Sequence, residues 1–271
     1  MKNKKNSFFG FLVILMLVSA SYPSLYKQEK THFSEEIENF LLTAEVISIE
    51  KNLELGRTNF WKVHLDDGKT ELMALFKHVN RPWPLLLPDS YTYEIAAYKI
   101  NKILGLNLVP PVVERKINGQ TGSLQLMIEN VITDRDRKLQ NIEPEKPYEF
   151  KNSLDTVKIF EILVNDQCND SEDILIQTDD WKVWRVDFSE AFFPSTDILL
   201  KCPIDRCSKS LYNKLLELDK SELKKVLSPY LNEKERDALW ERKQLIIKTI
   251  DDLIKQKGID QVLFSIFLSC E

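Results

Sequence analysis

The stretch that most constrains this chain runs from residue 160 to 193 and places carboxylates at both ends of a predicted hairpin. Its sequence is FEILVNDQCNDSEDILIQTDDWKVWRVDFSEAFF. The pattern predicts a helix end, a polar loop, and strands at Ile174–Gln177 and Trp181–Asp187 joined by a turn. The acidic residues around these strands are Asp166, Asp170 and Asp173 before the first and Asp187 at the end of the second.

Carboxylates at the ends of buried strands suit a divalent cation. Mg²⁺ takes a few oxygen ligands from a protein and keeps its remaining waters. For any single Asp, ordinary turn chemistry is the alternative explanation. The hypothesis of a metal site therefore depends on several of these residues acting together.

The same stretch resembles the catalytic loop and metal-binding strand of the atypical kinases, which include HipA-type bacterial kinases, phosphatidylinositol kinases and the secreted Golgi casein kinase group. Their pattern is roughly F-D-x-L-I-x-N-x-D-R-H-x-x-N-I-L-I, a short turn, and L-W-x-I-D-x-x-x-A-F. Residues 160–176 fit the first part without a gap, and VWRVDFSEAF at 183–192 fits the second. The resemblance implies that Asp187 is the metal-binding Asp and that Asp173 stands where the family has a metal-binding Asn.

The catalytic loop departs from the family pattern. The ungapped register puts Cys168 at the position of the catalytic Asp, with Asn169 and Asp170 at the following Arg and His. A shifted alignment would make Asp166 the catalytic base, but it would have to accommodate two extra residues between Asp166 and Asp173. We therefore prefer the ungapped alignment. A Cys is mostly protonated near neutral pH, and losing a general base costs about 10²–10⁴-fold in rate.

Alternating residues predict a small β lobe ahead of this stretch. A short amphipathic helix at Phe33–Leu42 is followed by predicted strands at Glu45–Lys51, Phe60–Leu65 and Thr70–Lys77. Asp67-Gly68 supplies a hairpin turn with φ > 0. The three strands predict an antiparallel meander.

Helical spacing predicts a helix at Asp89–Leu104. The stretch DSYTYEIAAYKINKILGLNLVPPVVER resembles the helix and following strand of the secreted and HipA-like kinases. The resemblance implies that Glu94 pairs with Lys77, at the end of the third strand, so that the ammonium can meet nucleotide phosphates. The alternative is two surface charges that never meet.

Two more strands are predicted at Val112–Lys116 and Ser123–Met127, with Gly119 and Gly122 supplying the bends between them. Leu124–Ile128, which includes Leu126, then falls where these kinases connect their lobes, and its backbone would face the adenine. Gly56 alone lies between the first two strands. The chain therefore lacks a Gly-rich phosphate loop, and backbone cradling of phosphates would be weak.

The second half is predicted to be mostly helical. Residues 132–148 are charged and turn-rich and predict a surface insertion, followed by a helix at 150–164. Asp219-x-x-Glu222 and Asn232-x-x-Glu235 predict helix starts. These patterns predict an α+β chain, and the resemblance implies that it has a two-lobed protein-kinase-like fold. The β-rich lobe would span 33–128 and carry one long helix, and the helical lobe would span 129–271 and carry the catalytic-loop hairpin.

The N-terminus predicts export. Residues 1–20 combine three Lys, an apolar run and Val-Ser-Ala as a cleavage site, and 21–32 form a polar linker. An uncleaved membrane anchor is the alternative. Export makes disulfides permissible; Cys202 and Cys207 are close enough in sequence to bridge, while Cys168 and Cys270 have no obvious mate.

Charge limits the choice of partners. Cleavage would remove three Lys and no acid, taking the formal net charge from −5 to −8. An acidic chain argues against nucleic acid, because phosphate neutralisation needs clustered Lys and Arg. The three His are not spaced like a zinc site.

The resemblance and the N-terminal pattern thus imply an exported atypical kinase of low or impaired activity that binds ATP with Mg²⁺ or Mn²⁺ and for which a protein is one candidate substrate. One alternative is a catalytically dead pseudokinase that binds a nucleotide or a partner. Another is an exported helical protein of structural role.

Overall fold

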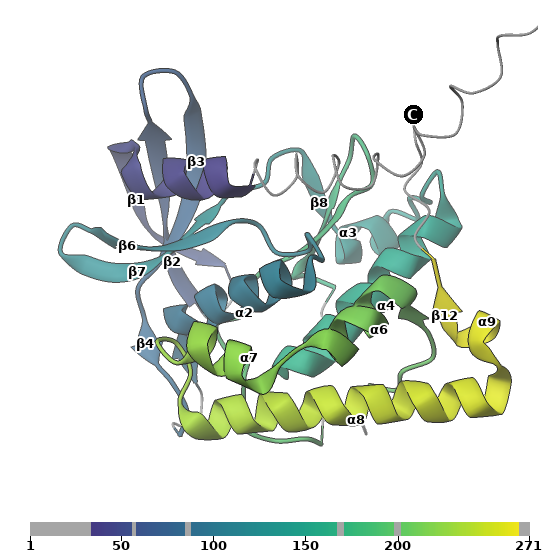
Figure 1. Cartoon of the computed structure of the whole chain (residues 1–271). Coiled ribbons are helices and arrows are strands. Elements are labelled where there is room, and N and C mark those ends of the chain that lie inside the picture. The colour runs from purple at the N-terminus through teal and green to yellow at the C-terminus, as the bar shows by residue number, and fades with distance from the viewer. Residues whose placement is uncertain (1–33, 56–57, 85–87, 167–170, 198–201, 266–271) are drawn as a thin grey trace, which may run out of the picture.

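Alternating apolar residues in the first half of the chain form a five-stranded antiparallel sheet (Figure 1). The computed structural model describes residues 34–55, 58–84, 88–166, 171–197 and 202–265. The strands, in sheet order, are β1 (Glu45–Leu55), β2 (Thr58–Asp66), β3 (Glu71–Lys77), β7 (Gln120–Leu126) and β6 (Val112–Ile117).

A helix at 34–43 covers one face of this sheet. Phe40, Leu41 and Ala44 pack there against Val63 and Phe76 of the strands. Arg115 of β6 donates to the carbonyl oxygens of Leu41 and Ala44, at 2.8 and 2.6 Å. The end of the helix is thereby tied to the sheet.

Helix α2 (Tyr91–Leu104) packs on the opposite face of the sheet and belongs to a second, larger core. Ser90 is its N-cap, and Gly105 ends it with φ of 64°, a conformation that favours glycine. The two-residue strands β4 (Asn80–Arg81) and β5 (Asp89–Ser90) pair just before it. Tyr93, Ala97 and Ile100 of α2 are fully enclosed in the larger core.

The second half surrounds helix α4 (Pro147–Val164). A three-stranded sheet, β10 (Val183–Arg185), β9 (Ile174–Gln177) and β8 (Val131–Thr133), lies beside it with helix α3 (Asp134–Leu139). The C-terminal elements are α6 (Lys209–Glu217), α7 (Lys220–Leu227), α8 (Glu233–Lys257) and α9 (Ile259–Val262), with β11 (Cys207–Ser208) pairing in parallel with β12 (Leu263–Phe264). The long helix α8 runs beneath α4, α6 and α7 (Figure 1).

The two-lobed α+β prediction is confirmed, and several local predictions can be compared with the structure. Asp219 caps α7 by accepting from the backbone N–H groups of Ser221 and Glu222, and Asn232 with Glu235 forms the predicted capping box of α8. The residues 1–20 and 21–32, predicted as signal and linker, lie outside the described residues. Among the described residues, no helix has the length and apolar character needed to cross a bilayer.

Three local predictions were wrong. Residues 131–139, predicted largely as a surface insertion, contain β8 and α3, and β8 pairs with β9. The strand predicted at Trp181–Asp187 is only Val183–Arg185. Gly122 lies inside β7 rather than at a bend, and a Cβ there would be 2.2 Å from the Lys77 carbonyl oxygen, so this glycine permits close approach of two strands.

The suggested pairing of Cys202 with Cys207 was also wrong. Cys207 is free and buried, whereas Cys202 is disulfide-bonded. The partner of Cys202 therefore lies outside the described residues. Burial raises the pKa of the Cys207 thiol to about 12, which keeps it protonated and unreactive near neutral pH.

Candidate functional site

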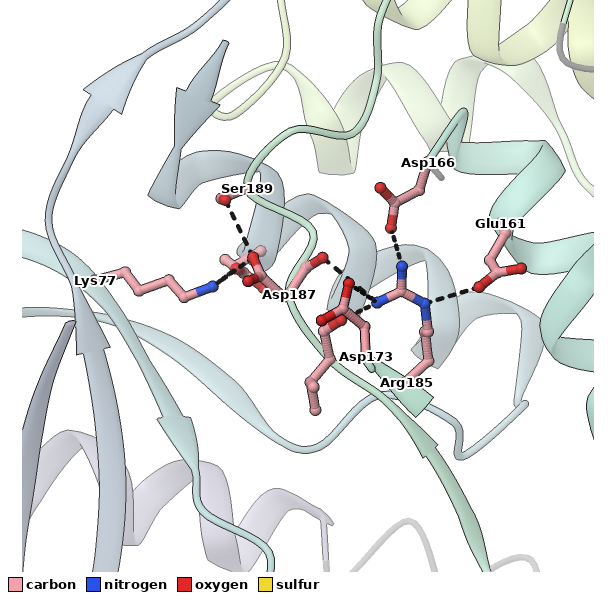
Figure 2. Close-up of polar contacts among 9 residues, drawn as sticks. Lys77, Glu161, Asp166, Asp173, Arg185, Asp187 and Ser189 are labelled. Carbon is pink, nitrogen blue, oxygen red and sulfur yellow. Dashed lines mark hydrogen bonds and ion pairs between the residues drawn. The ribbon is translucent and has the colours of Figure 1, made fainter. Parts of the chain in front are cut away.

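Lys77, the last residue of β3, lies between two carboxylates from other parts of the chain (Figure 2). Its ammonium donates to Glu94 Oε1 of α2 at 2.5 Å and to Asp187 Oδ1, which follows β10, at 2.7 Å. The ion pair predicted between Lys77 and Glu94 is present. The Glu94 side chain is 3% exposed, the Lys77 side chain 13% and the Asp187 side chain 35%, so the group opens to solvent at Asp187.

Alternation along β3 explains the direction of Lys77. Phe76 points into the core beneath the helix at 34–43, so its neighbour Lys77 points to the opposite face, towards α2. Glu94 lies in the first turn of α2, on a helix held firmly by the larger core. The backbone N–H of the cap residue Ser90 donates to the Ser189 carbonyl at 2.8 Å, which joins the start of α2 to the segment after Asp187.

Asp187 adopts a backbone conformation that few residues other than glycine take. Its φ is 62°, in the left-handed region that Asp tolerates better than bulkier residues. The Ser189 hydroxyl donates to Asp187 Oδ1 at 3.1 Å. An uncommon backbone conformation of this kind is frequent at functional sites.

Arg185 of β10 forms a second centre beside the first (Figure 2). Its Nε donates to Glu161 Oε1 at 2.9 Å, and its Nη2 donates to Asp166 Oδ2 at 2.7 Å. Its Nη1 lies 3.5 Å from Asp173 Oδ2. The Arg185 side chain is fully enclosed, whereas the Asp173 side chain is 29% exposed.

The ionisation of Lys77, Asp187 and Glu94 follows from these contacts. Burial alone would lower the pKa of Lys77, but Glu94 and Asp187 outweigh burial and raise that pKa above its ordinary value. Burial acts to raise the pKa of Asp187, yet the Lys77 ammonium holds it below its ordinary value. Burial raises the pKa of Glu94 although Lys77 opposes the rise. The cationic Lys77 and anionic Asp187 therefore reinforce one another near neutral pH.

Several carboxylates contact the two buried cations. Among the described residues, those paired with Lys77 or Arg185 are Glu94, Glu161, Asp166, Asp173 and Asp187. Within the described ranges, no three His, Cys, Asp or Glu residues form a metal-binding group. Mg²⁺ is commonly held by one or two carboxylates together with substrate phosphates, and the partly exposed Asp173 and Asp187 fit that donor set.

The remaining predicted site residues are Leu126, Gly56 and Cys168. Leu126 packs its side chain against the core of the sheet, and its backbone N–H donates to the Pro111 carbonyl at 2.9 Å. The N–H of the next residue, Met127, donates to the Met73 carbonyl at 2.9 Å. These two donors are therefore engaged within the protein. Gly56 and Cys168, with Asp170, lie outside the described residues.

Asp166, the alternative base, is held inside the protein. It is 7% exposed, and Oδ2 accepts the hydrogen bond from Arg185. Its backbone N–H donates to the Glu161 carbonyl at 3.0 Å. A carboxylate neutralised in this way is poorly suited to accept a proton from a substrate.

Sequence reasoning did not identify Arg185, Glu161 or Gln125. Arg185 has a detectable sequence signal, because it alternates with the apolar Val183 in a strand and an inward-facing charged residue there needs a partner. In the structure both side chains are buried. Gln125 pairs across the sheet with Leu75, two residues from Lys77, and so lies on the face from which Lys77 extends. Its Nε2 is buried and has no hydrogen-bond partner among the described residues.

The geometry can be compared with known proteins. No family model matches the chain, and no curated protein matches its sequence. Among solved structures, one of hydra Fam20 with sugar matches at a TM-score of 0.64 and 17% identity, covering 86% of this chain and 93% of that one. A structure of the Helicobacter pylori proinflammatory kinase CtkA matches at a TM-score of 0.51 and 11% identity, covering 81% and 98%.

At these identities the likeness concerns the fold, and it extends over most of all three chains. The antiparallel sheet, the helix carrying Glu94 and the helical second half are the parts that a two-lobed kinase fold requires. The chain therefore has a two-lobed, kinase-like fold.

Proposed function

We propose that this protein binds ATP with Mg²⁺ or Mn²⁺ in the cleft around Lys77 and transfers phosphoryl groups weakly. The observation that carries the proposal is the convergence of Lys77, Glu94 and Asp187 from three separate elements. A lysine fixed by a helix glutamate meets nucleotide phosphates in kinases, beside an aspartate that holds the metal. Phosphoryl transfer depends mainly on such positioning and charge stabilisation.

Each residue would have a defined task. Glu94 orients the Lys77 ammonium, which binds phosphate oxygens. Asp187 and Asp173 are the partly exposed carboxylates that would hold the divalent cation. When bound, the cation would supply positive charge to the phosphate oxygens. Ser189 donates to Asp187 and so restrains its carboxylate.

We propose that Gln125 contacts the purine base of the nucleotide. Its side chain lies on the same face of the sheet as Lys77, and its buried amide nitrogen has no partner among the described residues. An unpaired buried donor is unfavourable by about 1–3 kcal/mol. An acceptor on a nucleotide base would remove that penalty, which favours a base over an apolar ligand at this end of the cleft.

Weak phosphoryl transfer follows because neither candidate position offers a good catalytic base. The Asp166 carboxylate is engaged by Arg185, and the position aligned with the catalytic Asp is Cys168. A pseudokinase that binds nucleotide without turnover is therefore the second candidate, favoured by the same engagement of Asp166.

We also propose that the protein is exported. The N-terminal charge and apolar pattern supports export. The disulfide at Cys202 adds independent support, because structural disulfides persist mainly in oxidising compartments. The exported protein would meet nucleotide and any protein substrate outside the cytosol.

Nucleotide binding is tested with Asp187→Asn and the matched control Asp179→Asn, an exposed acid in the turn of the same hairpin. At about 100 times Kd, ATP with Mn²⁺ should stabilise the wild type by about 2.7 kcal/mol, a rise in Tm of several degrees. Asp187→Asn should lose most of this shift, measured by thermal denaturation, and Asp179→Asn should keep it. Absence of a shift in the wild type would count against a nucleotide site.

Phosphotransfer is tested by autophosphorylation of the wild type, Cys168→Asp and Asp166→Asn. Restoring a base at residue 168 should raise the rate by about 10²–10⁴-fold. Activity that arises only in Cys168→Asp would identify the native protein as a pseudokinase. If Asp166→Asn abolishes an existing activity instead, Asp166 is the base and the shifted register is correct.

Export and cysteine chemistry are tested together by mass spectrometry of protein secreted from an expressing cell and purified without reductant. The N-terminus should be Ser21. Trypsin cuts after Arg206 and so separates Cys202 from Cys207. In the unfolded, unreduced protein Cys207 should be alkylated, and Cys202 should react only after reduction. An intact leader, or Cys202 linked to Cys207, would contradict this account.

A further inference from the structure

Two backbone donors at the end of β7 are already used within the protein. The N–H of Leu126 donates to the Pro111 carbonyl, and the N–H of Met127 donates to the Met73 carbonyl, each at 2.9 Å. A backbone N–H is a single donor, so neither group can donate to a nucleotide base while these bonds are kept. Side chains are therefore the candidates for reading a base beside these two residues.

Gln125 offers such a side chain on the face of the sheet that carries Lys77. It pairs with Leu75 of β3, and Leu75 and Lys77 share a face because side chains two residues apart in a strand point the same way. Leu124 and Phe76 point to the other face, into the core beneath the helix at 34–43. The Gln125 amide therefore belongs to a row of side chains about 7 Å along the strand from the row of Lys77.

The amide of Gln125 is enclosed but not committed to a partner. Gln125 is 7% exposed, and its Nε2 has no hydrogen-bond partner among the described residues. A buried donor of this kind is unfavourable until an acceptor reaches it. The amide is thus free to turn over when a ligand arrives.

A side-chain amide can read two different purines. Its nitrogen donates and its oxygen accepts, and a half-turn of the terminal torsion exchanges the two. On the Watson–Crick edge, adenine presents the acceptor N1 beside its N6 amino donor, whereas guanine presents the acceptor O6 beside its N1–H donor. An amide that turns over can match either edge with two hydrogen bonds. A backbone N–H and carbonyl are fixed in place and match only one order.

We propose that Gln125 is a specificity-determining residue that lets the site bind GTP as well as ATP. This inference rests on the proposed function, because it takes Lys77 as the group that binds the phosphates of the same nucleotide. The role of Gln125 is confined to the base. A Gln125 that only packs against its neighbours in the sheet would leave nucleotide affinity unchanged when it is substituted.

The first test compares two purines on the wild-type protein. Binding is measured calorimetrically with Mn²⁺ and non-hydrolysable analogues of ATP and GTP, and with inorganic triphosphate as a probe that lacks a base. The Kd values for the two purines should agree within about fivefold, whereas a fixed donor and acceptor would separate them by roughly 10- to 100-fold. A preference larger than about fivefold for either purine overturns the proposal.

The second test uses Gln125→Met, which keeps the length of the side chain and removes both hydrogen-bonding groups. Affinity for both purines should fall by a similar factor, roughly 5- to 100-fold, because two hydrogen bonds to the base are lost. Binding of inorganic triphosphate should not change. The unliganded variant should be at least as stable as the wild type, because an unpaired buried donor has been removed.

Gln120→Met is the matched control. Gln120 is the first residue of the same strand and is exposed, so this variant should bind all three probes as the wild type does. Purine binding that is unchanged in Gln125→Met overturns the proposal. An equal loss of triphosphate binding also overturns it, because the residue would then act through the fold.

The outcomes separate this inference from the proposed function. A wild type that binds neither purine nor triphosphate rejects the proposed function and this inference with it. Binding of ATP without GTP keeps the proposed function and overturns this inference alone.

Discussion

The enclosure of two cations among five carboxylates is the interaction on which the cleft depends. Lys77 joins the sheet to α2 and to the segment after β10, and Arg185 joins β10 to the end of α4. Taking such charges out of water is unfavourable unless each is paired and hydrogen-bonded. Removing either cation would therefore take a hydrogen-bonded opposite charge away from two or more carboxylates and would weaken the contacts between the elements that carry them.

Packing and hydrogen bonds in the surrounding structure hold this arrangement in place. Helix α2 is anchored in the larger core, and its Tyr93 hydroxyl donates to Glu235 of α8 at 2.5 Å. The segment after Asp187 is fixed at the end of α4, because Asn165 donates to the Phe193 carbonyl at 2.6 Å and Arg242 to the Ser195 carbonyl at 2.8 Å. Glu94 and Asp187 are thus both held beside Lys77 by well-packed elements.

Much of the fold and the first centre could be predicted from the sequence. Strand alternation, helical spacing and the resemblance at two stretches were enough to place Lys77 beside Glu94, as the structure has them. The second centre could not be predicted so easily, because Arg185 contacts carboxylates up to 24 positions away and no local pattern sets those distances. The catalytic-loop register depends on Cys168 and its neighbours, which lie outside the described residues.

The central claim is that the Lys77 ammonium is the group that meets the phosphates of a nucleotide. Labelling with an acyl-phosphate derivative of ATP, which acylates lysines next to bound phosphates, addresses it directly when the modified peptide is mapped by mass spectrometry. The account predicts preferential modification of Lys77 that free ATP with Mg²⁺ suppresses. Modification spread over surface lysines and insensitive to ATP would contradict it.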